Sequence, residues 1–283
     1  MKAGLLAGVH ALAAVRSAVP GVLGDVVYLA NADEEIGSPS STGLIRSMAE
    51  RSDAALVLEC ARASGAIVSS RKGTTDLRIR LAGRAAHAGV EPEKGRSAIL
   101  AAAHLVTALH ALPSRYETVT CNVGVIAGGT RPNVVAEQAT LEVNLRAATG
   151  TELDAVLAEI RALATSPGVP DVTAEVEVVS AWRPMEKSPA AARLATHART
   201  LAASLGFDLE DVATGGASDG NTTAGIGVPT LDGLGPIGGM DHSPAEYVEV
   251  ASIVPRTVLL AALMVAISRD PAFAPGARAG GAA

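Results

Sequence analysis

The hydrophobic pattern of this chain changes at about residue 74 and changes back at about residue 183. Before residue 70, short continuous apolar runs alternate with helical spacing, which is typical of strands buried on both faces of an α/β sheet. Residues 76–81 instead alternate polar and apolar side chains, as a strand with one solvated face does. Because one sheet cannot satisfy both patterns, the sequence predicts an α/β domain interrupted by a separate sheet domain.

The spacing of apolar residues also predicts the individual elements. In the outer segments we expect helices at 1–15, 43–50, 190–205 and 247–268 and strands at 25–30, 54–58 and 228–231. In the inner segment we expect strands at 76–81, 118–126, 139–146 and 173–179, and helices at 95–112 and from a capping Thr151 to 164. The inner order, β-α-β-β-α-β, is that of the ferredoxin-like unit. The predicted domains are 1–70, 71–182 and 183–283, with a frayed tail from about residue 271.

Composition restricts the function classes. Hydrophobic residues make up 48% and charged residues 18% of the 283 positions, which excludes a disordered chain. The net charge is −6 and no run of Lys or Arg occurs, so neither a nucleic acid nor a membrane is the expected partner. Cys60 and Cys121 have no zinc-type spacing, and a reducing, cytoplasmic location is expected. The apolar N-terminus is interpreted as a core helix, with a signal peptide and export as the alternative.

Two adjacent acids, Glu34 and Glu35, lie in the segment 31–38, which follows the apolar run 26–30 directly. Two like charges at a strand end are costly unless a cation lies beside them, and a divalent metal ion is the usual solution. One carboxylate then binds the ion while its neighbour serves as a general base. A solvated acidic turn explains the pair equally well when it is considered alone.

Two further candidate ligands follow the same logic. Glu59 ends the apolar run 54–58, and His242 lies in a glycine-bounded loop before the last helix. Ligands of α/β proteins bind where strands end on one edge of the sheet, and a Glu/Glu/His set suits zinc. Singly, Glu59 is as well explained as a loop acid and His242 as a capping histidine. Three such residues at one sheet edge are hard to explain by chance.

Several motifs together resemble a known family. The segments Asn-Ala-Asp-Glu-Glu-Ile-Gly-Ser at 31–38, Gly-Arg-Ala-Ala-His-Ala-Gly at 83–89 and Gly-Met-Asp-His-Ser-Pro at 239–244 resemble those of the co-catalytic zinc amidohydrolases. That family includes aminoacylase, acetylornithine deacetylase, succinyl-diaminopimelate desuccinylase and glutamate carboxypeptidase, the last being most similar. The resemblance implies a mixed-sheet catalytic domain holding two Zn²⁺ per subunit, interrupted by a lid that also forms a homodimer.

The resemblance also implies roles for the metal-site residues. Glu34 would be the general acid/base that activates the metal-bridging water. Glu35 and His242 would bind one zinc ion, and Glu59 would bind the other.

In the inserted domain, the resemblance implies that His87 polarises the scissile carbonyl, reaching a partner subunit's site in dimeric relatives. Asn133 and Arg146 would hold the substrate's α-carboxylate, for which the planar guanidinium of Arg is well shaped. Without the family, His87 is better explained as a packed turn histidine and Arg146 as a solvated strand end. The glycine-rich segment 215–221 matches a family loop near the site, although a plain connection explains it nearly as well.

The chain departs from the family pattern at its start. The family takes two further ligands from upstream motifs, a His-x-Asp histidine and an aspartate placed directly before a Met-Lys-x-Gly helix start. This sequence begins at Met-Lys-Ala-Gly and contains no His-x-Asp motif. We therefore expect an N-terminally truncated chain that lacks two metal ligands, holds zinc poorly and has impaired activity.

The predicted activity is hydrolysis of an amide or peptide bond next to a free carboxylate, of the carboxypeptidase or N-acyl amino-acid deacylase type. The substrate would be a small peptide or an N-acyl amino acid. Arg62, Arg71 and Lys72 are candidates to bind an acidic substrate side chain. The alternative hypothesis is a non-catalytic dimerising or binding protein that keeps the fold without the zinc pair.

Overall fold

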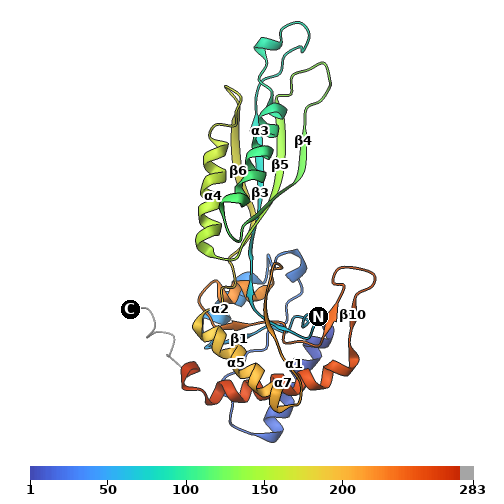
Figure 1. Ribbon diagram of the computed structural model, residues 1–283, viewed down its shortest axis with the longest axis vertical. Helices are drawn as coiled ribbons and strands as arrows, with labels where there is room; N and C mark the ends of the chain where they lie inside the picture. Colours follow the sequence, from blue (N-terminus) through green and yellow to red (C-terminus); the bar gives the residue numbers. More distant parts are fainter. Residues whose placement is uncertain (275–283) are drawn as a thin grey trace. The chain divides into compact units, whose positions relative to one another are not determined.

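The computed structural model describes residues 1–274, and the chain divides into two compact units (Figure 1). Unit 1 combines Met1–Arg71 with the chain from Met185 onward, and unit 2 is the intervening Lys72–Pro184. The catalytic role of segments 1–70 and 183–283 and the lid role of segment 71–182 stay predictions.

Unit 2 is a four-stranded antiparallel sheet with two helices. Its elements are β3 (Gly73–Ala82), α3 (Ala98–Ala111), β4 (Thr120–Gly128), β5 (Gln138–Ala147), α4 (Gly150–Ala164) and β6 (Thr173–Trp182), with short 3₁₀ turns at Pro92–Lys94 and Leu112–Arg115. The strand order is β4-β5-β3-β6, and every neighbouring pair is antiparallel. The predicted β-α-β-β-α-β order is confirmed.

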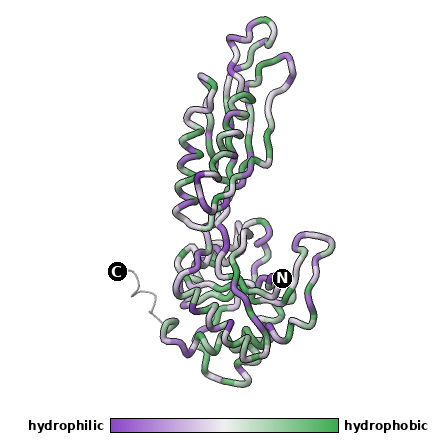
Figure 2. Tube along the Cα trace, in the orientation of Figure 1, coloured by the Kyte–Doolittle hydropathy of each residue, from purple (hydrophilic) through white to green (hydrophobic). Residues whose placement is uncertain are grey.

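The core of unit 2 follows from the period-two burial of β3 and β5. Figure 2 colours the chain by hydropathy and shows hydrophilic and hydrophobic residues mixed along this unit. Leu77 and Ile79 of β3 are buried against α3 and α4, whereas Arg78 and Arg80 lie on the solvated face. The outward face thus carries charged residues such as Arg78 and Glu142, together with the half-exposed apolar side chain of Val125.

The first turn of α4 differs from the prediction. The capping residue is Thr149, whose hydroxyl accepts a hydrogen bond from the Glu152 backbone N–H at 3.2 Å. Thr149 has an extended backbone, as an N-cap requires, whereas Thr151 already lies inside the helix. The prediction of a Thr151 cap is wrong by half a helical turn.

Unit 1 contains five helices in its described part and only short strands. The helices are α1 (Lys2–Ala18), α2 (Thr42–Glu50), α5 (Pro189–Ser204), α6 (Asp219–Ala224) and α7 (Val250–Arg269). The strands are β1 (Ala55–Leu56), β2 (Ile67–Arg71), β7 (Asp211–Thr214), β8 (Thr230–Leu231), β9 (Gly238–Gly239) and β10 (Tyr247–Val248). β1 pairs with β8 and β2 with β7, both in parallel, and β9 pairs with β10 antiparallel.

The core of unit 1 gathers around α7. Both α1 and α5 pack against this helix, and Leu259 and Leu263 of α7 are buried beside Leu194 of α5. Arg256 is also buried on α7, where its guanidinium donates to the backbone carbonyls of Gly235 and Gly65 at 3.1 Å each. By length and composition alone α7 could also cross a membrane, a weak indication because core helices pass the same test.

The predicted strand at 25–30 is wrong. This segment has no regular secondary structure, and the side chains of Val26 and Val27 are 49% and 58% exposed. A strand needs a neighbour for its backbone N–H and C=O groups, and no strand within residues 1–274 pairs with this segment. Hydrophobic content alone therefore did not determine a strand here.

The prediction of a frayed tail is wrong for residues 271–273. Pro271–Phe273 form a short 3₁₀ turn in which Phe273 is buried, because the Asp270 carboxylate caps the turn by accepting from the Ala272 N–H at 3.0 Å. The rest of the predicted tail, 275–283, lies outside the described residues.

Candidate active site

The two neighbouring glutamates lie in a tight turn whose shape is set by Asp33. Glu34–Ile36 form a single 3₁₀ turn, closed by a hydrogen bond from the Ser38 N–H to the Asp33 carbonyl at 2.8 Å. The Asp33 carboxylate accepts from the N–H and the hydroxyl of Ser40, at 2.7 and 2.6 Å, and from the hydroxyl of Ser41. These hydrogen bonds lower the pKa of Asp33 to about 2. Asp33 is therefore the structural acid of the turn.

Glu34 and Glu59 are half-buried carboxylates in one electrostatic neighbourhood. Burial, together with the charges of Asp219 and Glu35, raises the pKa of Glu34 to about 7. Burial likewise raises the pKa of Glu59 to about 7, helped by the charges of Asp232 and Glu34. The structure thus brings together two acids that are 25 residues apart in sequence. Both ionise reluctantly at neutral pH, because each is short of water and close to other anions.

Glu35 and His242 form the second pair that the sequence predicted. The His242 Nδ1 lies 3.6 Å from the Glu35 Oε2, and both side chains are more than 70% exposed. His242 lies in the turn between β9 and β10 and has a left-handed φ of 62°, as does Met240, two residues earlier, at 60°. Two non-glycine residues in this region signal a strained turn that presents the imidazole outward.

These residues fit a metal ion in donor type but not in number. Carboxylate oxygens and an imidazole are zinc donors, and Glu34 and Glu59 are half-buried carboxylates with further acids, Asp219 and Asp232, nearby. Within residues 1–274, however, no three His, Cys, Asp or Glu side chains are grouped to hold an ion. A catalytic zinc normally takes three protein ligands, and the described donors do not reach that number around one point.

A buried polar network that sequence reasoning missed lies beside these acids. The Arg71 guanidinium donates to the Asp232 carboxylate at 2.8 Å, and both side chains are almost fully buried. Asp232 also accepts from the Ser218 hydroxyl at 2.6 Å. Arg71 is thus the buried partner of Asp232, which corrects its interpretation as a receptor for an acidic substrate side chain. Asp232 directly follows β8, so the rule that selected Glu59 could also have selected it.

The other two candidate receptors also have partners on the protein. The Arg62 guanidinium donates to the Cys60 carbonyl at 3.3 Å, and the Lys72 ammonium donates to the Thr118 carbonyl at 2.5 Å. No basic residue is therefore assigned to an acidic substrate side chain.

In unit 2 the structure brings His87 and Asn133 together. The loops that carry these residues run side by side. The Ala88 N–H donates to the Asn133 carbonyl at 3.0 Å, and His87 forms an isolated antiparallel β-bridge with Val134. The His87 Nδ1 accepts from the Gly89 N–H at 3.2 Å, which orients the ring.

Arg146 lies at the opposite end of the same sheet. It pairs with Thr74 at the start of β3, whereas Ala82 at the end of β3 pairs with Gln138, close to the His87 loop. Eight residues of strand separate these positions, which is roughly 26 Å at about 3.3 Å per residue. One copy of unit 2 therefore cannot place His87 and Asn133 beside Arg146.

The Arg146 side chain is held by a polar chain across the sheet. Its Nε donates to the Asn144 Oδ1 at 2.9 Å, and the Asn144 amide donates to Asp76 at 2.7 Å. Asp76 in turn accepts from the Ser180 hydroxyl at 2.7 Å. The guanidinium is thus ordered on the solvated face of the sheet.

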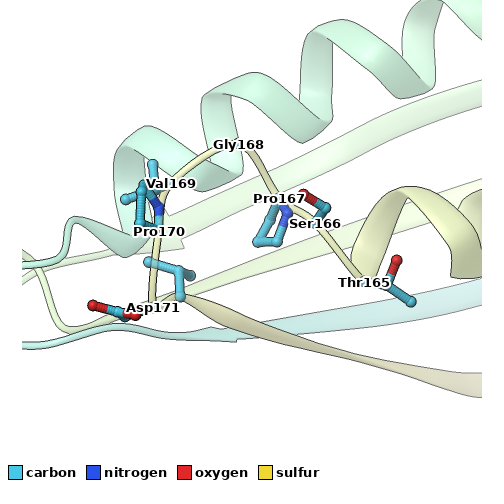
Figure 3. A pocket seen from close by; sticks show the side chains of 8 residues that line it. Thr165, Ser166, Pro167, Gly168, Val169, Pro170 and Asp171 are labelled. Atoms are coloured by element: carbon cyan, nitrogen blue, oxygen red, sulfur yellow. The ribbon is translucent and has the colours of Figure 1, made fainter.

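A hollow in unit 2 lies away from all of these residues. It is lined by residues 165–172, the loop between α4 and β6 (Figure 3). Asp171 is the only charged side chain of this loop, and it pairs with Arg96 at 3.0 Å. None of the predicted site residues lines this hollow.

Comparison with known proteins places the fold. Residues 69–172 match the M20-type peptidase dimerisation domain. The solved structure of aminopeptidase PepT from Bacillus cereus superposes with a TM-score of 0.76 at 24% identity, over 94% of this chain and 70% of that one. Most of unit 2 therefore matches a peptidase dimerisation domain, and the whole chain has a mixed α/β fold.

The sequence relatives are hydrolases where their names state an activity. Carboxypeptidase G2 of Pseudomonas sp. (strain RS-16) is 28% identical over 86% of this chain and 59% of its own length. Protein YqjE of Bacillus subtilis is 30% identical over 74% of this chain and 56% of its own. A p-aminobenzoyl-glutamate hydrolase chain of Escherichia coli is 45% identical over 76 residues, which are 26% of this chain and 17% of that one. The chain is thus a relative of the M20 peptidases, and it spans less than two thirds of the length of the first two relatives.

Proposed function

We propose that this protein hydrolyses an amide or peptide bond next to a free carboxylate, as a carboxypeptidase or an N-acyl amino-acid deacylase. The observation that carries the proposal is the grouping of Glu34 with Glu59 and of Glu35 with His242 in unit 1. The relatives named carboxypeptidase and p-aminobenzoyl-glutamate hydrolase support it, and they favour glutamate conjugates as the first substrates to test. We expect the protein to act in the cytoplasm.

Glu34 is the proposed proton-transfer group. A carboxyl whose pKa lies near 7 can both take a proton from an attacking water and return it to a leaving amine at neutral pH. Its half-buried position strengthens the electrostatic interactions of the carboxyl group, because less water surrounds it. Zinc, with Glu35, His242 and Glu59 as donors, is the proposed cofactor. Since the described donors do not complete such a site, the zinc content of the chain is itself a result to measure.

The substrate-binding residues lead to a proposed homodimer. Arg146 and Asn133 are proposed to hold the substrate's carboxylate and His87 to polarise its carbonyl. Because the sheet separates Arg146 from His87 and Asn133, a substrate that touches all three has to meet two copies of unit 2. The match to a peptidase dimerisation domain supports this arrangement.

The decisive experiment is hydrolysis of p-aminobenzoyl-glutamate and N-acetyl-glutamate by the purified chain, with and without added Zn²⁺. Glu34→Gln should lower kcat by about a thousandfold or more, because it removes proton transfer and leaves the donors in place. Zinc content, measured by elemental analysis, should not change. Glu50→Gln, an exposed acid at the end of α2, is the matched control and should behave as the wild type.

Mixing two inactive variants tests the shared site. A dimer of one Glu34→Gln chain and one His87→Ala chain contains one intact site if His87 acts on its partner, so activity should return to about a quarter of wild type. No recovery in a mixture shown to exchange chains would contradict the shared site. A wild-type chain that dimerises but neither retains zinc nor cleaves either substrate would favour the alternative of a non-catalytic dimerising protein.

A further inference from the structure

The Glu34–Glu35 turn is anchored at both ends by one residue from a distant part of unit 1. The Asp219 carboxylate accepts from the Ser38 hydroxyl at 2.6 Å through one oxygen and from the Asn31 amide at 2.7 Å through the other. Asn31 and Ser38 are the residues that flank the turn, and their side chains also contact each other at 3.2 Å. One carboxylate thus closes the base of the loop that carries both glutamates.

Ser38 needs such an anchor because its backbone is unusual. It is a fully buried residue with a left-handed φ of 50°, a conformation that is unfavourable for a non-glycine residue. Its carbonyl accepts from the Thr42 N–H at 2.9 Å and from the Thr42 hydroxyl at 2.7 Å, so Ser38 also joins the turn to α2. With the hydroxyl bound to Asp219, the N–H, the carbonyl and the hydroxyl of Ser38 all have hydrogen-bond partners.

Asp219 is itself held rigidly. It is the first residue of α6, whose start is fixed by a reciprocal cap between Ser218 and Asn221. The Ser218 hydroxyl binds the buried Asp232, which is paired with Arg71. The turn is therefore connected, through Asp219, to the buried ion pair.

We propose that Asp219 is the positioning residue of the Glu34–Glu35 turn, holding Glu34 at a fixed place for proton transfer. This assignment rests on the proposed role of Glu34, and it gives a function to the glycine-rich segment 215–221. Asp219 acts through Ser38 and Asn31 rather than on the substrate.

The test uses three variants of the full chain. Asp219→Ala removes both acceptors, whereas Asp219→Asn keeps an oxygen for Ser38 and an amide that can pair with a reoriented Asn31 side chain. Asp208→Ala, which removes an exposed acid of the same unit, is the matched control.

The first readout is amide hydrogen exchange and does not depend on activity. In Asp219→Ala, exchange within 33–42 should be about tenfold faster or more, while 98–111 in unit 2 is unchanged. Asp219→Asn and Asp208→Ala should stay within about threefold of wild type. Unchanged exchange in Asp219→Ala, or equal acceleration in Asp219→Asn, overturns the proposal. If Asp219→Ala does not fold, Ser38→Ala should speed exchange in 33–42 by about threefold, and no change there overturns it.

The second readout is kinetic. In an active chain, Asp219→Ala should lower kcat about tenfold or more with KM within about threefold, and Asp219→Asn should recover most of kcat. A rise in KM alone contradicts positioning of Glu34. A wild-type chain without hydrolysis contradicts the proposed function, whereas hydrogen exchange still decides whether Asp219 holds the turn.

Discussion

In unit 2, four strands of nine or ten residues pair along nearly their whole length, whereas the strands of unit 1 are two to five residues long and pair two at a time within the described residues. Unit 2 thus has a continuous ladder over one apolar core. Unit 1 relies more on buried polar groups that join distant segments, notably Arg71 with Asp232 and Arg256 with backbone carbonyls. Because different interactions stabilise them, the two units should respond to different substitutions.

The largest expected effect comes from breaking the buried ion pair of unit 1. Asp232→Ala leaves the Arg71 charge buried without its partner and should lower the free energy of unfolding by about 4 kcal/mol. Denaturant unfolding measures the loss, and hydrogen exchange should locate it in unit 1. The control is Asp154→Ala, which breaks an exposed pair with Arg183 in unit 2 and should cost about 0.5 kcal/mol or less. Equal costs for the two variants would remove the distinction between the units.

A smaller effect should depend on pH. Hydrogen bonds from Arg193 and His197 hold the pKa of Asp270 well below its usual range, so the carboxylate contributes stability above the unfolded pKa of about 4 and loses it as pH falls further. Asp270→Asn should cost about 1–2 kcal/mol at pH 7, reduced by the exposure of Arg193. Denaturant unfolding from pH 7 to pH 3 should show this difference shrinking below pH 4. A difference that is constant with pH would show that the charge of Asp270 does not matter.

The smallest effect tests the helix cap of unit 2. Thr149→Ala removes the hydroxyl that accepts from the Glu152 N–H and should cost about 1 kcal/mol. Thr151→Ala, two residues later in the first turn, should change stability by less than about 0.5 kcal/mol. Thermal unfolding of the two variants decides between the observed and the predicted cap. A larger loss in Thr151→Ala would restore the prediction from sequence.

Features that depend on local sequence were predictable, whereas features that depend on contacts between distant residues were not. The alternation in β3 and the helical spacing around α3 are local signals, so the order of elements in unit 2 was predictable. Glu59 and Glu34 were predictable as acids that follow apolar runs. Segment 25–30 carries the same signal without forming a strand, because pairing depends on a neighbour that local sequence does not specify.

The anchoring of the turn was not predictable for the same reason. Ser38 and Asp219 are 181 residues apart, and Arg71 and Asp232 are 161 residues apart. No spacing rule connects such residues, since each alone resembles an ordinary loop or strand position. The separation of Arg146 from His87 likewise emerged only from the strand register.

Because of that register, β3 and β5 act as a ruler: their length sets the distance between the His87 loop and Arg146. Because each residue adds about 3.3 Å, deleting two residues from both strands would keep every side chain on its own face but shorten the ruler by about 7 Å. Apart from Arg146 and the side chains that hold it, outward-facing residues on these strands can vary in kind far more freely than the strands can vary in length. Insertions and deletions in β3 and β5, rather than substitutions, are the changes that this unit should tolerate least.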